Sequence, residues 1–489
     1  PHGTTTVITD PHEIANVCGL EGVRYMHQAG DDLPMRQLID IPSCVPAVPG
    51  LENAGAEFFA AEVEELSGLD RVIGLAEVMD FLAVIHGEDR MMDIIDVMDK
   101  KGLYLQGHAP YVSGRMLSAY LCGGPNTCHE TRDRKEALEK LRSGMFVDAR
   151  DSSITKNVQE VYEGVKGVRF FDHLCLCTDD READDILHVG HMNDVVRSAI
   201  RCGMDPVTAI KSATLNTARE IHLENLGAIA PGYVADLLLV DDLTELKPSH
   251  VFFGGKLVAR DGKLTVEIPH REYPLEKVNT MCVKELSRED FVIHTPVENG
   301  TVTVHVMEYP DLNLSSTLLT TAQLPVKNGE VCLEGEDLKF VAVVNRHKGH
   351  DTIGLGIVKG FGTTCGALAS TVSHDSHNLT IVYDTPENAL LAANALIRCG
   401  GGMSAVKDGS LLHVLELPLA GLISLKVAKD LAEDSQKMKE ANRALGLTGM
   451  ENPLLRIVTL ALPVIPNIKM SDLGMVDVLK KEFIPMFAE

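Results

Sequence analysis

Four residues whose side chains can bind a metal ion follow one another at the ends of strand-like runs. They are Glu77, His108, His129 and Asp179, two carboxylates and two imidazoles. Oxygen and nitrogen ligands of this kind suit divalent Mn, Fe or Zn. Such an ion lowers the pKa of a bound water, so that hydroxide forms near neutral pH and can attack an electrophilic carbon. Any one of the four alone would more often be a structural histidine or an exposed carboxylate. Their joint occurrence at strand ends predicts a metal site.

The elements that must position these residues are short β-rich runs that alternate with amphipathic helical segments from Pro1 to about Met204. The strand-like runs are Thr6–Asp10, Gln37–Ile41, Arg71–Glu77, Leu103–His108, Thr127–Glu130, Met145–Arg150 and His173–Asp179. Strands alternating with helices predict parallel βα units, one strand short of a closed (β/α)8 barrel. The chain starts with Pro rather than Met, so we expect the barrel's first strand to precede Pro1.

The carboxyl ends of the other predicted strands also carry polar residues. Asp10 is followed by Pro11, His12 and Glu13, and Arg150 and Asp180 stand at two later strand ends. In a (β/α)8 barrel this face carries the chemistry, because side chains from different strands converge there. His12 and Glu13 are candidates to bind substrate or a further ion, and a simple turn explains them equally well. Arg150 and Asp180 are weaker substrate-binding candidates.

The chain after the predicted barrel changes in character. We predict domains at 1–222 (the barrel), 223–283 (a small β-sandwich module with Gly-rich turns) and 284–489 (an α+β domain). Within the last, Ser373–Asn378 holds His374 and His377 in a loop that closes over the barrel or only orders its own turn.

Composition limits the partners. The formal charge is −25, from 70 acidic and 45 basic residues, which argues against nucleic acid as a partner and favours a free small molecule. No apolar stretch is long enough to span a bilayer, so no membrane partner is expected. The 11 cysteines include no C-x-x-C pair, which favours reduced thiols in the cytoplasm and excludes the zinc deaminases that carry P-C-x-x-C.

The sequence motifs around these residues resemble those of the adenine deaminases of the amidohydrolase superfamily. The resemblance is carried by residues 2–17 (HGTTTVITDPHEIANV), 74–79 (GLAEVM), 107–110 (GHAP), 177–181 (CTDDR) and 190–191 (GH). The motifs SHDSHN at 373–378 and LPVIP at 462–466 are similar to motifs in the C-terminal domain of the same family. The resemblance therefore covers essentially the whole chain. The run 227–236 (GAIAPGYVAD) is shared by many amidohydrolases and is less specific.

The resemblance implies hydrolysis of free adenine to hypoxanthine and ammonia in purine salvage, by a homo-oligomer. It implies a binuclear site, with manganese as the first choice and iron or zinc as alternatives. Glu77 would bridge the two ions, His108 and His129 would bind one of them, and Asp179 would bind metal and accept a proton. Glu130 would donate a proton to the ring, because attack at C6 moves charge onto N1.

The sequence departs from the family's pattern at three places. Cys128 stands where the family has Asp, and Arg150-Asp-Ser-Ser153 replaces an Arg-Glu-Gly-Ser-like run. The family's His-x-His pair on the first strand is absent, so we expect this polypeptide by itself to hold the metals poorly and to be inactive. Two other functions stay open. One is cyclic-amide hydrolysis, whose enzymes often use a carboxylated Lys where Glu77 stands, and no Lys occurs in 72–81. The other is a non-catalytic barrel.

Overall fold

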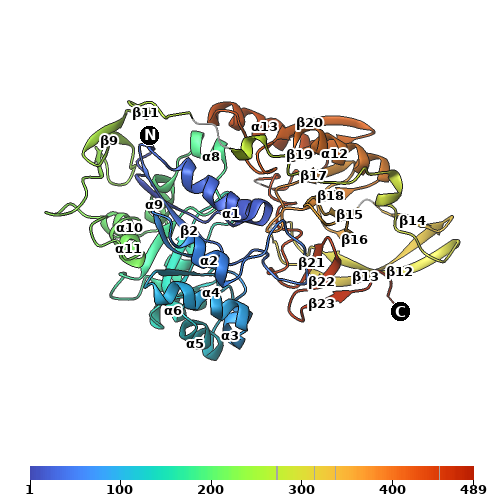
Figure 1. Cartoon of the computed structure of the whole chain (residues 1–489), viewed down its shortest axis with the longest axis horizontal. Coiled ribbons are helices and arrows are strands. Elements are labelled where there is room, and N and C mark those ends of the chain that lie inside the picture. The colour runs from blue at the N-terminus through green and yellow to red at the C-terminus, as the bar shows by residue number, and fades with distance from the viewer. Residues whose placement is uncertain (271–273, 313, 336, 451, 489) are drawn as a thin grey trace. The chain divides into compact units, whose positions relative to one another are not determined.

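The computed structural model describes residues 1–270, 274–312, 314–335, 337–450 and 452–488 (Figure 1). Its residues group into two compact units. The first unit comprises Pro1–His12, Val23–Cys44 and Phe58–Glu272, and the second comprises Glu13–Gly22, Val45–Glu57 and Tyr273–Glu489. The chain therefore passes repeatedly from one unit to the other. The domain limits expected from the sequence stay a prediction.

The first unit contains all seven predicted parallel strands, in two sheets with the orders β1-β2-β3-β4 and β5-β6-β7. The strands are β1 (Thr6–Thr9), β2 (Arg36–Ile41), β3 (Val72–Val78), β4 (Tyr104–Gly107), β5 (Thr127–Cys128), β6 (Phe146–Arg150) and β7 (Leu174–Cys177). Within each of the two sheets, every strand pairs with its neighbours in sequence, and helices fill the connections. This is the mixed α/β arrangement that the alternating pattern predicted, while closure into a barrel stays a prediction.

Helices α1 to α11 occupy the connections between and after these strands. They are α1 (His12–Ala29), α2 (Ala60–Leu66), α3 (Phe81–His86), α4 (Asp89–Lys100), α5 (Gly114–Cys122), α6 (Arg134–Arg142), α7 (Val158–Val165), α8 (Ala183–His188), α9 (Met192–Arg201), α10 (Pro206–Ser212) and α11 (Leu215–Glu220). Helix α6 begins where the Asp133 carboxylate accepts hydrogen bonds from the backbone N–H groups of Lys135 and Glu136, which satisfies two free helix donors.

One face of the β5-β6-β7 sheet is covered by helices. Val147 and Ala149 of β6 pack with Val161 of α7 and with Val195 and Ala199 of α9 in one buried cluster. Side chains alternate along a strand, so Asp148 and Arg150 of β6 point to the opposite face. That face holds the polar residues described below.

Residues 223–270 of the first unit form one antiparallel sheet in the order β11-β10-β9-β8. Its strands are β8 (Leu237–Val240), β9 (Pro248–Phe253), β10 (Lys256–Arg260) and β11 (Lys263–Leu264). The described part of this segment provides a single sheet, so the second layer of the expected sandwich stays a prediction. Residues 271–273 of the predicted module lie outside the described residues.

The second unit is built on a nine-stranded mixed sheet in the order β14-β13-β12-β16-β15-β18-β17-β19-β20, beside a three-stranded sheet β21-β22-β23. The strands are β12 (Asn299–Glu308), β13 (Leu318–Lys327), β14 (Glu330–Val331), β15 (Leu338–Val344), β16 (Ile353–Lys359), β17 (Ala367–Ser370), β18 (Leu379–Tyr383), β19 (Gly402–Lys407), β20 (Ser410–Glu416), β21 (Ile468–Ser471), β22 (Gly474–Asp477) and β23 (Glu482–Ile484). The helices are α12 (Pro386–Cys399) and α13 (Ala428–Ala444), with two short 3-10 turns, η1 (Pro274–Lys277) and η2 (Arg288–Phe291).

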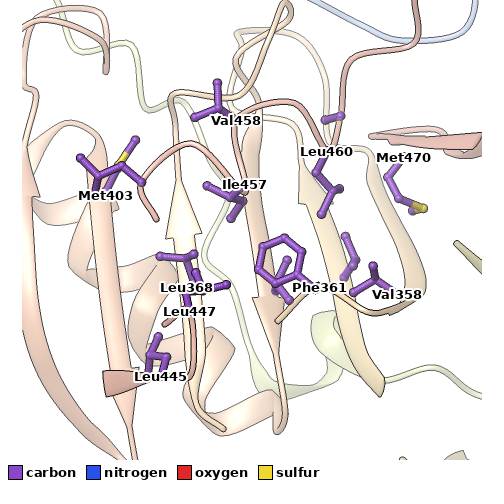
Figure 2. Close-up of a cluster of buried hydrophobic side chains, with 14 of the residues drawn as sticks. Val358, Phe361, Leu368, Met403, Leu445, Leu447, Ile457, Val458, Leu460 and Met470 are labelled. Atoms are coloured by element: carbon purple, nitrogen blue, oxygen red, sulfur yellow. The ribbon is translucent and has the colours of Figure 1, made fainter. Parts of the chain in front are cut away.

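The middle strands β15, β17 and β18 of the nine-stranded sheet are buried on both faces. Along β15, Val341 and Val343 belong to one apolar cluster, and Phe340, Ala342 and Val344 belong to another. Figure 2 shows part of the first cluster, in which Phe361, Leu368 and Ile457 lie close together. Because β15 is apolar on both sides, it reads as a continuous hydrophobic run in the sequence.

Among the described residues, no helix is both long enough and apolar enough to cross a bilayer.

Candidate active site

Three of the four predicted metal ligands come together in the first unit. Glu77 lies in β3, while His108 directly follows β4 and His129 directly follows β5. The Glu77 Oε2 atom lies 2.6 Å from His108 Nδ1 and 3.0 Å from His129 Nε2. The two imidazoles meet edge to face with ring centroids 5.3 Å apart. One ligand atom from each of the three residues lies within 4.8 Å of the others, close enough for the three side chains to share one ion after small adjustments.

Electrostatic attraction links the Glu77 carboxylate to the imidazoles of this group. Burial alone would raise the pKa of Glu77, but His129 and His108 hold it well below its ordinary value. Burial alone would lower the pKa of His129, but the Glu77 carboxylate raises it to about 9. A buried carboxylate thus draws positive charge onto the imidazole beside it. One carboxylate and two imidazole nitrogens also form a donor set that fits a divalent ion of the Mn, Fe or Zn type. The residues present therefore fit a metal.

Asp179, the fourth predicted ligand, lies in a neighbouring group. It follows β7 in the left-handed region of backbone conformation, with φ 54°. Its Oδ1 atom accepts a hydrogen bond of 2.6 Å from the backbone N–H of Asp180. Ligand atoms of Asp179, Glu130 and His129 lie within 4.8 Å of one another, so His129 belongs to both groups. The Asp180 residue is exposed and enters neither group.

Arg150, at the end of β6, lies between the two carboxylates of this second group. Its guanidinium contacts Glu130 and Asp179, and Arg132 contacts Glu130 as well. Burial alone would raise the pKa of Glu130, but Arg150 and Arg132 hold it well below its ordinary value. Glu130 is therefore a carboxylate in this state, and it must first receive a proton before it can donate one.

The adjacent residues His12 and Glu13 have different surroundings. His12 Nδ1 lies 2.9 Å from Asp10 Oδ1 and 4.0 Å from Glu77 Oε1, so His12 lies on the same face of the first unit as the candidate ligand Glu77. Glu13 belongs to the second unit, where its Oε1 lies 3.9 Å from His374 Nδ1. His377 is completely buried in the second unit.

Two features of this face were missed from the sequence. Asp10 accepts a 3.2 Å hydrogen bond from the Glu77 backbone N–H and pairs with His12. Its position at the end of a predicted strand was the sequence feature that could have identified it. Asp148 shares a hydrogen bond with Glu220, and Tyr104 donates a 2.7 Å hydrogen bond to Glu220. Burial raises the pKa of Asp148 to about 6. Its alternation with Arg150 along β6 could have placed Asp148 on this face, whereas nothing in the sequence pointed to Glu220.

Comparison with known proteins agrees with these observations. The amidohydrolase family model matches residues 1–258, and the model of the adenine deaminase C-terminal domain matches residues 315–482. Adenine deaminase 2 of Carboxydothermus hydrogenoformans is 39% identical over 99% of this chain and 84% of its own length. The adenine deaminases of Methanothrix thermoacetophila (39% identical over 100% of this chain and 84% of the relative) and Moorella thermoacetica (38%, 99% and 82%) are similar to a comparable degree. The chain belongs to the adenine deaminase family of amidohydrolases.

Proposed function

We propose that this protein hydrolyses free adenine to hypoxanthine and ammonia. The observation that carries the proposal is the buried group of Glu77, His108 and His129 in a chain whose relatives over nearly its full length are named adenine deaminases. The large negative charge supports a free base as substrate rather than a base within a nucleic acid.

The metal would be held by Glu77, His108, His129 and Asp179. Two manganese ions would fit these donors, with the Glu77 carboxylate supplying negative charge to both, and iron or zinc would suit the same donors. When bound, the metal supplies Lewis acidity that activates water near neutral pH. The division of the carboxylates into two groups, one around Glu77 and one around Asp179, supports different roles for these two residues.

Asp179 accepts a proton from the attacking water, whose oxygen forms a bond to C6 of the base. Asp179 passes this first water proton on to N1, by way of Glu130, as the ring loses its aromatic bonding. Asp179 then moves the second water proton from the new C6 hydroxyl to N6, the C6–N6 bond breaks, and ammonia leaves as the C6 carbonyl forms. We assign the donation to N1 to Glu130, which holds the proton only briefly because Arg150 and Arg132 favour its ionised form. Arg150 contacts both carboxylates, so one guanidinium orients the proton acceptor and the proton donor together.

Substrate contacts are assigned to His12, Arg150, Asp180 and Glu13. His12 has the best support, since it faces Glu77 within the same unit. Glu13 and Asp180 have less support, because neither lies in a group with the metal-binding residues.

The test compares three substrates on the Mn(II)-loaded full-length enzyme. We expect ammonia release and a shift to the hypoxanthine absorbance spectrum with adenine, and no comparable turnover with adenosine or cytosine. Protein stripped of metal by a chelator is the control and should be inactive until Mn(II) is restored. Equal turnover of adenosine would contradict the free-base assignment, and turnover of a cyclic amide in place of adenine would contradict the reaction itself.

A further inference from the structure

A lysine lies buried in the first unit directly behind the two histidines. Lys140 belongs to α6 and is completely inaccessible to solvent. Its Nζ atom donates to three acceptors: the Ala109 carbonyl at 2.7 Å, the Cys128 Sγ atom at 3.1 Å and the Glu136 Oε1 atom at 2.6 Å. The three donors of an ammonium group are therefore all used.

Two of these acceptors adjoin the candidate metal ligands in the chain. Ala109 directly follows His108, and Cys128 directly precedes His129. The Ala109 backbone N–H also donates to the Cys128 sulfur, at 3.4 Å. A single ammonium group thus ties the end of β4 to the end of β5, at the two points from which the imidazoles extend.

Glu136, the counter-ion of Lys140, also connects the two histidine-bearing loops. It does so through residues that lie further along each loop. Its Oε1 accepts from the Tyr111 backbone N–H and its Oε2 accepts from the Arg132 backbone N–H, both at 2.8 Å. Tyr111 lies in the loop that follows His108, and Arg132 lies in the loop that follows His129. The Glu136 side chain is also buried. Lys140 and Glu136 together contact both histidine-bearing loops.

A contribution to stability alone is a weak explanation for this pair. Removing two charges from water costs more than their attraction often returns, so an apolar pair would serve a core equally well. Burial alone would lower the pKa of Lys140, but Cys128 and Glu136 raise it above its ordinary value, and the group is charged. An apolar pair could not make the hydrogen bonds by which Lys140 and Glu136 hold the two loops.

We propose that Lys140 and Glu136 are positioning residues that set the separation of His108 and His129 and thereby the affinity of the site for metal. The inference rests on the proposed function only in taking these two histidines as ligands. Without the pair, the metal would have to order both loops as it binds, and its binding free energy would fall by that cost. The residues around metal ligands commonly change metal affinity about 10–100-fold when they are replaced.

The test measures Mn(II) binding alone in the full-length protein, by titration followed with the electron paramagnetic resonance signal of free Mn(II). We expect Lys140→Met to raise the Kd for Mn(II) by about 10–100-fold. The matched control is Lys469→Met. Lys469 is also completely buried and also links two loops, through the Ser315 and Thr459 carbonyls in the second unit. Both variants should lose thermal stability, and only Lys140→Met should lose metal affinity.

An unchanged Kd in Lys140→Met, or an equal loss of affinity in Lys469→Met, would overturn the inference. If Lys140→Met does not fold, Glu136→Gln takes its place, since it keeps the shape of the side chain and removes its charge. It should weaken Mn(II) binding in the same direction, and wild-type affinity in this variant would likewise overturn the inference. The binding assay contains no adenine. Normal Mn(II) binding without deamination would therefore contradict the proposed function while leaving the inference standing.

Discussion

Glu77 and Asp179 are both carboxylates near strand ends, but their surroundings differ. Glu77 lies between two imidazoles that keep it ionised. Asp179 is bound by Arg150 and by the N–H of Asp180, at the edge of a second group. If both residues were simply metal ligands, replacing either one should have the same effect. Their different partners argue for different effects.

We expect Glu77→Gln to lose bound metal together with activity, because it removes the charge that the site supplies to the ions. Asp179→Asn should retain much of its metal and lose turnover by roughly 10²–10⁴-fold, since the attacking water loses its base. Metal per subunit, measured by atomic emission, and ammonia release should be determined on the same samples. Near-normal turnover in Asp179→Asn, or full metal content in Glu77→Gln, would reverse the assignment.

At the scale of elements, the segment Val45–Glu57 belongs to the second unit although its neighbours in sequence belong to the first. Asn53 fixes it to Asp472, with hydrogen bonds of 3.0 Å from its backbone and 2.7 Å from its side chain. Glu52 is buried beside it and accepts a 3.2 Å hydrogen bond from the Val48 N–H. Burial, with the charge of Asp375, raises the pKa of Glu52 to about 8 from an ordinary 4.5.

This pKa predicts that the segment loosens as the pH rises from about 4.5 to about 8. Because the folded pKa is raised, the stabilising contribution of neutral Glu52 is complete below about pH 4.5 and is lost as pH rises through about 8. Limited proteolysis within 45–57 should therefore accelerate across that range. Glu52→Gln is neutral at every pH and should show a flat profile. The same acceleration in Glu52→Gln would assign the effect to another group.

At the scale of the whole molecule, the formal charge of −25 should keep polyanions away. A protein that binds a nucleic acid gains affinity by releasing counterions from the phosphates, which requires clustered basic residues. We expect a short single-stranded oligoadenylate to show no anisotropy change at roughly 0.15 M salt, no ammonia release and no inhibition of adenine hydrolysis. The measurement is repeated with EDTA, because free Mn(II) can bridge phosphates to carboxylates. Binding that weakens as salt increases would contradict the prediction.

The sequence was most informative where structure depends on neighbours along the chain. The limits of the seven strands agree to within a few residues, and Glu77, His108 and His129 could be predicted to meet because parallel strands bring their carboxyl ends to one edge. Glu136 and Lys140 are an i,i+4 pair of one helix, so their contact follows from the spacing. The Lys140 contacts to Ala109 and Cys128 could not be predicted, since a lysine in an amphipathic helix is normally solvated and these two acceptors come from other elements.

His12 and Glu13 show a different limit of sequence reasoning. They were predicted as a pair, but the structure assigns them to different units, because α1 begins at His12 and continues into the second unit. No local sequence pattern indicates which residues will pack against a segment that follows hundreds of residues later in the chain. For the same reason, the domain limits and the role of His374 and His377 stay predictions.

The second unit is formed by three separate segments of the chain, and this affects how the protein folds during synthesis. Glu13–Gly22 and Val45–Glu57 leave the ribosome early, yet most of the unit that they complete is made last. At about 5–20 residues per second, these two early pieces wait for tens of seconds without their partners. During that time the apolar side chains of these two pieces are open to other contacts in the cell. A chaperone that holds the nascent chain would therefore affect the yield of this protein more than that of one whose domains are consecutive along the chain.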